Sequence, residues 1–219
     1  MPRYFVTLLA LLLLAAAPSA LACGWGGEND ADDDDEAIVI GADGRPVVED
    51  AVDLAALTGL GNRQREKGDL AAALVSYRRA TELGHAPAQN NLATMYEQGL
   101  GLPRDETQAA VWFRRAAEAG FAPAQHSLAG LLRGAPEAAI WLRRAVTGGH
   151  HTAFVDLGAL YWAGRGVEKD PVEALACWMV AAEVGVPSAA EPRRRALAVL
   201  STAEVSRAEK RARTLRPSH

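Results

Sequence analysis

Apolar and small side chains recur along the chain at the spacing of one face of an α-helix. The segment that begins at Ala88 carries alanine, leucine, alanine and tyrosine at positions i, i+4, i+5 and i+8. Similar patterns begin at Ala124 and at Ala153, which lie 36 and 29 positions further along in turn. Because these spacings place side chains on one face of a helix, each segment predicts an amphipathic helix within an internal repeat.

A second helix-forming segment follows each first one. The sequence of residues 109–117, AAVWFRRAA, recurs closely at 138–146 and more loosely at 73–81 and 174–182. Glycine-containing turns separate the two segments of a pair, and a further glycine, often followed by proline, ends each pair. Helix pairs repeated at about 36 residues are typical of solenoids. The sequence therefore predicts an all-α fold, an α-solenoid of about four helix-turn-helix repeats.

The end of the chain has the pattern of a closing helix. A partial repeat at 188–200 is followed by Ser201 and, three positions later, Glu204, which is the pattern of a helix N-terminus. The helix expected from Thr202 to about Thr214 is rich in arginine and lysine. A solenoid unit buries its apolar face only against its neighbours, so the ends need polar caps. We predict a repeat domain at 53–200 and a C-terminal capping helix and tail at 201–219.

The repeated letters are similar to those of a known family. The copy from Ala153 to Gly185 fits the pattern A-x3-LG-x2-Y-x2-G-x-GV-x2-D-x3-A-x6-AA-x2-G. In this pattern the chain resembles the Sel1-like repeat family, relatives of the tetratricopeptide repeats, over about residues 53–200. The one departure is Cys177, which stands where the family has tryptophan, with Trp178 beside it. The resemblance implies a protein-binding solenoid. Its pattern is carried by Leu157, Gly158, Tyr161, Gly164, Gly166, Val167, Asp170, Ala174, Ala181, Ala182 and Gly185.

The first 22 residues have the pattern of a secretory signal peptide. Arg3 precedes an uncharged, largely apolar stretch that ends in small residues immediately before Cys23. An uncleaved membrane helix fits less well, because the apolar block is short and is followed by Pro18. The segment Ser19-Ala20-Leu21-Ala22-Cys23 resembles a bacterial lipobox, except that Ala20 stands where leucine is usual. Lipidation of Cys23 and ordinary cleavage after Ala22 stay open, and both predict export, either to the periplasm or as an outer-membrane-anchored lipoprotein.

The segment at 23–52 is dominated by acidic side chains. From Glu28 to Asp53 eleven acids stand against a single base, and residues 32–36 are an unbroken acidic run. Such a run repels itself and cannot pack, so we predict an acidic flexible tether. The net charge of -4 and pI near 5.8 exclude a generally basic protein that coats nucleic acid, and we expect no nucleic-acid partner.

The sequence offers no arrangement typical of catalysis. The histidines at 85, 126, 150 and 151 have no carboxylate or cysteine at metal-ligand spacing. Cys177 falls in a core column, which predicts a buried thiol, and a Cys23–Cys177 disulfide stays open if Cys23 is not lipidated. We expect no enzyme, cofactor or metal. The alternative, a cell-wall hydrolase or penicillin-binding accessory enzyme, requires a nucleophile–base pair or a metal triad.

The resemblance also implies where a partner binds. In related repeats the first helix of each pair lines the concave, ligand-binding face. Among the positions expected to point outward there, Trp162 is expected to be exposed and to anchor the contact. The predicted function is a scaffold or adaptor of the bacterial cell envelope, a monomeric domain that binds a protein partner. The predicted binding residues are Thr58, Asn62, Asn90, Thr94, Glu97, His126, Arg133 and Trp162.

A column of arginine pairs is predicted on the second helices. These pairs are Arg78-Arg79, Arg114-Arg115 and Arg143-Arg144, which occupy equivalent positions of successive repeats. A solvated face that keeps an alanine-rich domain soluble is the favoured interpretation. A site for an acidic partner or a phosphate-bearing envelope polymer is the alternative.

Overall fold

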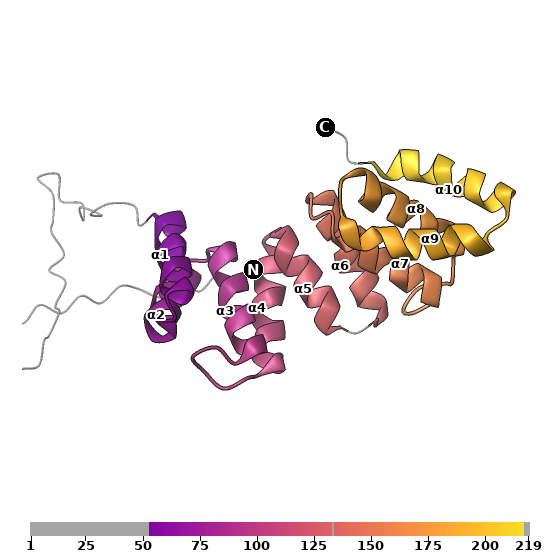
Figure 1. Ribbon diagram of the computed structural model, residues 1–219. Coiled ribbons are helices and arrows are strands. Elements are labelled where there is room, and N and C mark those ends of the chain that lie inside the picture. Colours follow the sequence, from indigo (N-terminus) through magenta and orange to yellow (C-terminus); the bar gives the residue numbers. More distant parts are fainter. Residues whose placement is uncertain (1–52, 133, 217–219) are drawn as a thin grey trace, which may run out of the picture. The chain divides into compact units, whose positions relative to one another are not determined.

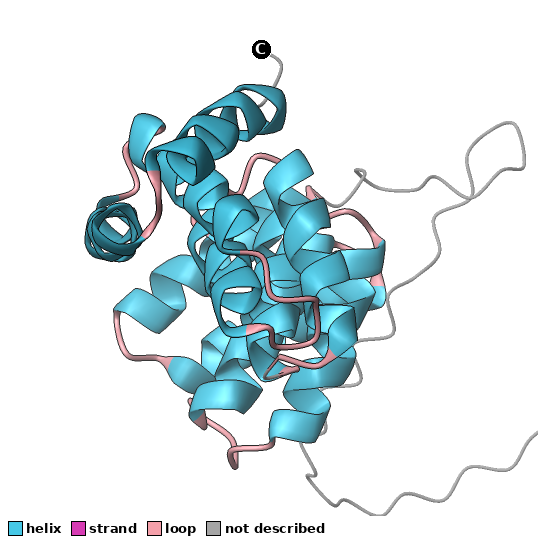
Figure 2. Cartoon of the chain, turned by 90° about the vertical axis from the view of Figure 1, so that its right-hand side faces the viewer, coloured by secondary structure: helices cyan, strands magenta, loops and turns pink. Residues whose placement is uncertain are grey.

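The computed structural model describes residues 53–132 and 134–216. The predicted signal peptide, Cys23, the predicted tether and Arg133 lie outside these residues. Within the described ranges every regular element is a helix (Figure 2), so the all-α prediction is confirmed. No helix in this part of the chain is long and apolar enough to cross a membrane.

Four consecutive helix pairs make up most of the described chain (Figure 1). Each helix packs on the next one in the sequence, both within a pair and between pairs. This arrangement confirms the predicted solenoid of about four repeats. The pairs are α1 (Leu54–Glu66) with α2 (Leu70–Glu82), α3 (Ala86–Gln98) with α4 (Glu106–Glu118), α5 (Ala122–Leu131) with α6 (Pro136–Thr147), and α7 (Ala153–Ala163) with α8 (Pro171–Glu183).

Aspartate and glycine set the helix boundaries. An aspartate side chain accepts hydrogen bonds from free backbone N–H groups at the start of α1, α2, α4 and α8, which stabilises a helix N-terminus. At the ends of α3 and α7, Gly99 and Gly164 adopt left-handed conformations with φ of 69° and 65°. A side chain disfavours this conformation, and so glycine is the residue that stops the helix there.

The core combines small residues with a few large ones. Alanines such as Ala109, Ala145 and Ala174 are fully buried, and small side chains let helix axes approach to roughly 8–10 Å. Tyr77, Phe113 and Phe154 are among the largest fully buried side chains. One core cluster lies in α2 and α3, and a second runs from α3 to the last helix; Tyr96 and Trp112 pack against both. The repeats are therefore joined through a shared interior.

The chain closes with a short 3₁₀ turn, η1 (Pro187–Ala189), followed by α9 (Ala190–Val199) and α10 (Thr202–Leu215). A capping box begins α10: the backbone N–H of Ser201 donates to Glu204 Oε2 at 2.9 Å, and the Ser201 hydroxyl accepts from the Glu204 N–H. The helix packs along α8 (Figure 1) and buries Ala208 and Ala212 in the core. The predicted C-terminal capping helix is thus confirmed.

Candidate functional site

The structure buries Thr58, the first of the predicted binding residues. Its side chain in α1 is only 4% exposed. The Thr58 hydroxyl donates to the carbonyl oxygen of Leu54 at 2.8 Å and lies 2.7 Å from His85 Nδ1. The expectation that Thr58 is exposed is wrong, because the loop before α3 places the His85 ring against it.

Asn62 in α1 is half-buried and holds three helices together. Its Oδ1 accepts one hydrogen bond from the Tyr77 hydroxyl of α2 at 2.6 Å and another from Asn91 Nδ2 of α3 at 2.9 Å. Burial raises the pKa of the Tyr77 hydroxyl above its ordinary value, so the phenol stays a donor at physiological pH. These contacts give Asn62 a structural part between the first two repeats.

Three predicted binding residues lie together on α3. Asn90, Thr94 and Glu97 are spaced along one face of the helix, and all three are half-buried. The Thr94 hydroxyl donates to the backbone carbonyl of Asn90 at 3.0 Å. Asn90 Oδ1 is buried and has no hydrogen-bond partner among the described residues. This face of α3 therefore keeps an unused acceptor.

His126 of α5 belongs to a polar cluster that reaches into the next repeat. Its Nε2 lies 2.5 Å from Asp156 Oδ2 of α7, and its ring centroid is 4.7 Å from that of His150. Burial, followed by the nearby His126 and His151, lowers the pKa of His150. The contact between His126 and Asp156 joins residues 30 positions apart, so local periodicity does not predict it; the only sequence signal is that this separation is about one repeat. No group of three or more potential ligands arranged for a metal occurs in the described ranges.

Trp162 of α7 is half-buried, not exposed as expected. Its ring packs against Trp178 of α8, with centroids 5.6 Å apart and an interplanar angle of 47°. The indole lines a hollow of about 300 Å³ between α7, α8 and α9, here called the Trp162 hollow. The lining is largely apolar with charges from Arg165, Glu191 and Arg195. Its residues are Ala159, Trp162, Ala163, Arg165, Trp178, Glu191, Pro192 and Arg195.

A second, smaller hollow lies on the other side of α7. It has a volume of about 200 Å³, is formed with α5 and α6, and shares Ala159 and Arg165 with the Trp162 hollow. Arg165 follows the end of α7 in the turn between Gly164 and Gly166. The position of Arg165 could not be predicted from the sequence, because a turn residue has no helical periodicity that would assign it to a face.

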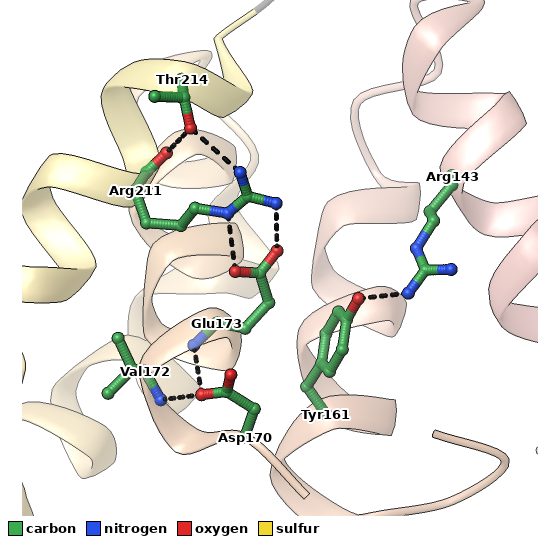
Figure 3. Close-up of polar contacts among 7 residues, drawn as sticks. All are labelled: Arg143, Tyr161, Asp170, Val172, Glu173, Arg211 and Thr214. Carbon is green, nitrogen blue, oxygen red and sulfur yellow. Dashed lines mark hydrogen bonds and ion pairs between the residues drawn. The ribbon is translucent and has the colours of Figure 1, made fainter. Parts of the chain in front are cut away.

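The arginines of the second helices engage neighbouring side chains. Arg114 of α4 pairs with Glu137 of α6 at 3.1 Å, and Arg143 of α6 donates to the Tyr161 hydroxyl of α7 at 2.5 Å (Figure 3). The guanidinium groups of Arg115 and Arg144 lie over the Trp112 and Trp141 rings, at 4.5 Å and 4.8 Å from the centroids. The contacts of Arg114 and Arg143 join one repeat to the next, a structural role that neither interpretation of the arginine column predicted, whereas those of Arg115 and Arg144 lie within one helix.

Cys177 of α8 is fully buried, as predicted from its core column. Burial raises the pKa of the thiol far above its ordinary value. The thiolate is the nucleophilic form of cysteine, so this side chain is unsuited to catalysis in the folded protein.

Comparison with known proteins identifies the repeats. The Sel1 repeat profile matches residues 86–121, 123–150 and 155–186. The crystal structure of a Sel1 repeat protein from Oxalobacter formigenes is 30% identical and covers 74% of this chain and 70% of that chain, with a TM-score of 0.63. That of a protective antigen present in uropathogenic Escherichia coli strains, which displays an SLR fold, is 26% identical over 74% of this chain and 45% of that chain, with a TM-score of 0.42. No curated protein matches the chain.

Proposed function

The chain belongs to the Sel1 repeat family, and we propose that it is a non-enzymatic scaffold that binds a protein partner at the Trp162 hollow. Sel1 repeat proteins generally serve as scaffolds for protein–protein interaction. The proposed face is the one that the first helices of the pairs provide, and the Trp162 hollow lies at its C-terminal end, where α7 meets α8 and α9. Solenoids use such a surface to present residues of successive repeats to one extended ligand.

The observation that carries this proposal is the half-buried Trp162. One side of the indole is fixed by Trp178, so little side-chain entropy is lost when a partner covers the remainder. Ala159 and Ala163 leave space beside the ring, and Arg165 adds a cation at the edge of the hollow. A rigid tryptophan in an apolar recess is typical of an interface hot spot.

The remaining predicted residues contribute less directly. Asn90, Thr94 and Glu97 lie on α3, the first helix of another repeat, where a long partner reaches their exposed atoms. We also propose that binding takes place in the bacterial cell envelope, after export directed by residues 1–22. The pattern of the first 22 residues and the lipobox-like segment before Cys23 support this location.

Site-directed photo-crosslinking in the source cell tests the proposed face. A benzophenone amino acid at Ala163, which is exposed and lines the hollow, should give a discrete adduct with one envelope protein. The matched control is the same probe at Val75 of α2, an apolar residue that is 67% exposed and that belongs to a second helix. The Val75 probe should not form that adduct.

Substitutions then measure how much the residues of the Trp162 hollow contribute to binding of the partner. Trp162→Ala should weaken capture of the crosslinked protein at least about tenfold, as expected for a hot-spot tryptophan. Ala163→Glu should do the same without removing the Trp162–Trp178 packing, which separates lost binding from lost stability. If both variants capture the partner normally and Arg114→Gln with Arg143→Gln does not, the binding face is that of the second helices and the proposal is wrong.

A further inference from the structure

The excess positive charge of the repeat domain is confined to its last two helices. Residues 54–185 contain thirteen bases and thirteen acids, and so their formal charges cancel. Residues 186–216, which include α9 and α10, contain eight bases and three acids. The domain therefore combines a balanced array of repeats with a strongly basic C-terminal end.

Part of this charge lines a hollow between α8, α9 and α10, here called the C-terminal hollow, with a volume of about 410 Å³. The α10 side of it is a single stripe of the helix, in which Glu209, Ala212, Arg213 and Arg216 follow one another at i, i+3, i+4 and i+7. Helix α9 contributes Arg193 to this hollow and other residues to the Trp162 hollow, and the two hollows share no lining residue. The lining residues are Met179, Ala182, Glu183, Arg193, Glu209, Ala212, Arg213 and Arg216.

Two of the three arginines in this hollow have no ion-pair partner among the described residues. Arg216 is bound to Glu183 by two hydrogen bonds of 2.9 Å. In contrast, no carboxylate of the described residues lies within 4.0 Å of Arg193 or Arg213. Glu209 is one turn from Arg213 and makes no ion pair there either. The hollow thus presents two free guanidinium groups beside the apolar atoms of its α8 and α10 walls.

We propose that the C-terminal hollow binds an acidic peptide segment of a protein partner. Guanidinium groups bind carboxylates through paired, charge-assisted hydrogen bonds, and Arg193 and Arg213 approach from different helices. Met179, Ala182 and Ala212 accommodate an apolar side chain between the acidic ones. A chain segment enters a recess between helices, whereas a flat bilayer does not. This site uses other residues than the Trp162 hollow, so the two proposals stand or fall separately.

Fluorescence anisotropy with the full-length protein tests this site. The probe is a labelled eight-residue peptide that alternates glutamate and leucine, because alternate side chains of an extended peptide point to opposite sides. A peptide with glutamine in place of glutamate is the control ligand. Arg193→Gln with Arg213→Gln should raise the Kd for the acidic peptide at least about tenfold, since two charge-assisted contacts are lost. The matched control, Arg78→Gln with Arg79→Gln in α2, removes the same charge from another repeat and should leave the Kd unchanged.

A substitution that is expected to strengthen peptide binding makes the test specific. Glu209→Gln removes a carboxylate that lines the hollow and has no ion-pair partner in the described part of the chain, and should tighten binding of the acidic peptide several-fold. If these residues had only a structural role, Glu209→Gln would not strengthen peptide binding. Circular dichroism melts of all variants show whether the fold is retained.

Three results would overturn the proposal. One is an equal loss of peptide binding in the α2 control, which would show non-specific attraction. Another is retention of peptide binding by Arg193→Gln with Arg213→Gln while binding to vesicles of phosphatidylglycerol is lost, which would assign the basic end to a membrane surface. The third is tighter binding after asparagine replaces Asp32, Asp33, Asp34 and Asp35, which would make the chain's own acidic run the occupant.

Discussion

Gly158 of α7 leaves the space that the indole of Trp178 of α8 occupies. A methyl group on Gly158 would lie 2.5 Å from Trp178 Nε1, and this nitrogen donates to the Val155 carbonyl at 3.1 Å. Gly61 of α1 stands in the same relation to Tyr77 of α2, where the added carbon would lie 2.6 Å from Cε1. In both pairs the glycine admits an aromatic ring with a polar atom.

The two middle helix pairs have side chains of different sizes at the same two positions. At the equivalent sequence positions the second pair has Ala93 with Phe113, and the third has Ala129 with Leu142, all four of them buried. A larger side chain on the second helix thus accompanies a smaller one on the first. The larger aromatic rings with a polar atom thus stand opposite glycine and the smaller apolar side chains opposite alanine, as close packing favours.

Gly158→Ala should therefore destabilise the protein by about 1–3 kcal/mol, the usual cost of an overpacked core. The matched control is Gly130→Ala in α5, another helical glycine, around which nothing lies within 4 Å of the added carbon. That substitution should stabilise by about 0.5–1 kcal/mol, because alanine loses less backbone entropy in a helix. Urea unfolding followed by circular dichroism measures both, and a stabilising Gly158→Ala would contradict the packing argument.

Periodicity was sufficient to predict the helix pairs, their glycine breaks and the closing helix. These features depend on local rules of helix formation and on repetition, both of which a single sequence contains. It also placed Cys177 correctly in the core. Residues that recur every three or four positions share one face of a helix, and Cys177 lies on the buried face of its helix. The size relation between Gly158 and Trp178 was out of reach, since it depends on which side chains meet across two helices.

The candidate site was harder to predict for a similar reason. Helical periodicity placed Thr58 on an outward face, but the loop residue His85 covers it, and loops have no periodic signal. Trp162 was expected to be free, and its contact with Trp178 depends on the crossing of α7 and α8. Arg165 and the pairing of His126 with Asp156 likewise join separate elements. A sequence pattern assigns faces to helices, and the contacts between helices decide which face stays open.

The C-terminal helix is expected to be needed for stability. Arg211 of α10 forms a bidentate ion pair with Glu173 of α8, in which Nε and Nη2 donate to the two carboxylate oxygens at 2.7 Å and 3.0 Å (Figure 3). Ala208 and Ala212 of α10 lie in the core. Truncation after Leu200 removes these contacts and exposes the apolar surface of α8. We expect a lower melting temperature and aggregation, measured by circular dichroism and light scattering.

The single substitution Arg211→Ala is the graded control for the truncation. It removes the ion pair but keeps the two buried alanines, and should cost only about 1 kcal/mol because the arginine side chain is half-exposed. A truncated protein that stays monomeric with an unchanged melt would show that residues 202–215 are a tail rather than a cap.

Cys23→Ser tests the proposed lipid anchor. If the lipobox-like segment directs lipidation, the wild-type protein should sediment with the membrane fraction and the variant should move to the soluble periplasmic fraction. Cell fractionation with intact-mass analysis of the mature protein measures this. Cys177→Ala is the control, because that thiol is buried in the fold, and its fractionation should match the wild type. Unchanged fractionation of Cys23→Ser, with no lipid mass on the wild type, would favour plain secretion.

His150 should make the protein less stable in mild acid. Burial is the main cause that lowers its pKa, the nearby His126 and His151 lower it further, and Asp156 opposes them. At a pH below about 6.5, the ordinary value for histidine, the unfolded chain binds a proton that the folded chain resists. The free energy of unfolding should consequently fall as the pH drops through that range.

The substitution His150→Asn isolates this contribution. Asparagine does not titrate there, and the loss of the contact of 2.8 Å between His150 Nε2 and the Thr152 hydroxyl affects stability at both pH values alike. Urea unfolding at pH 7.5 and pH 5.5 should therefore show a smaller loss of stability in His150→Asn than in the wild type. The comparison uses the difference between the two pH values, so a uniform effect of the substitution on stability cancels. An equal loss in both proteins would mean that His150 takes up its proton as readily in the folded state as in the unfolded one, and that the ring cluster with His126 does not resist protonation.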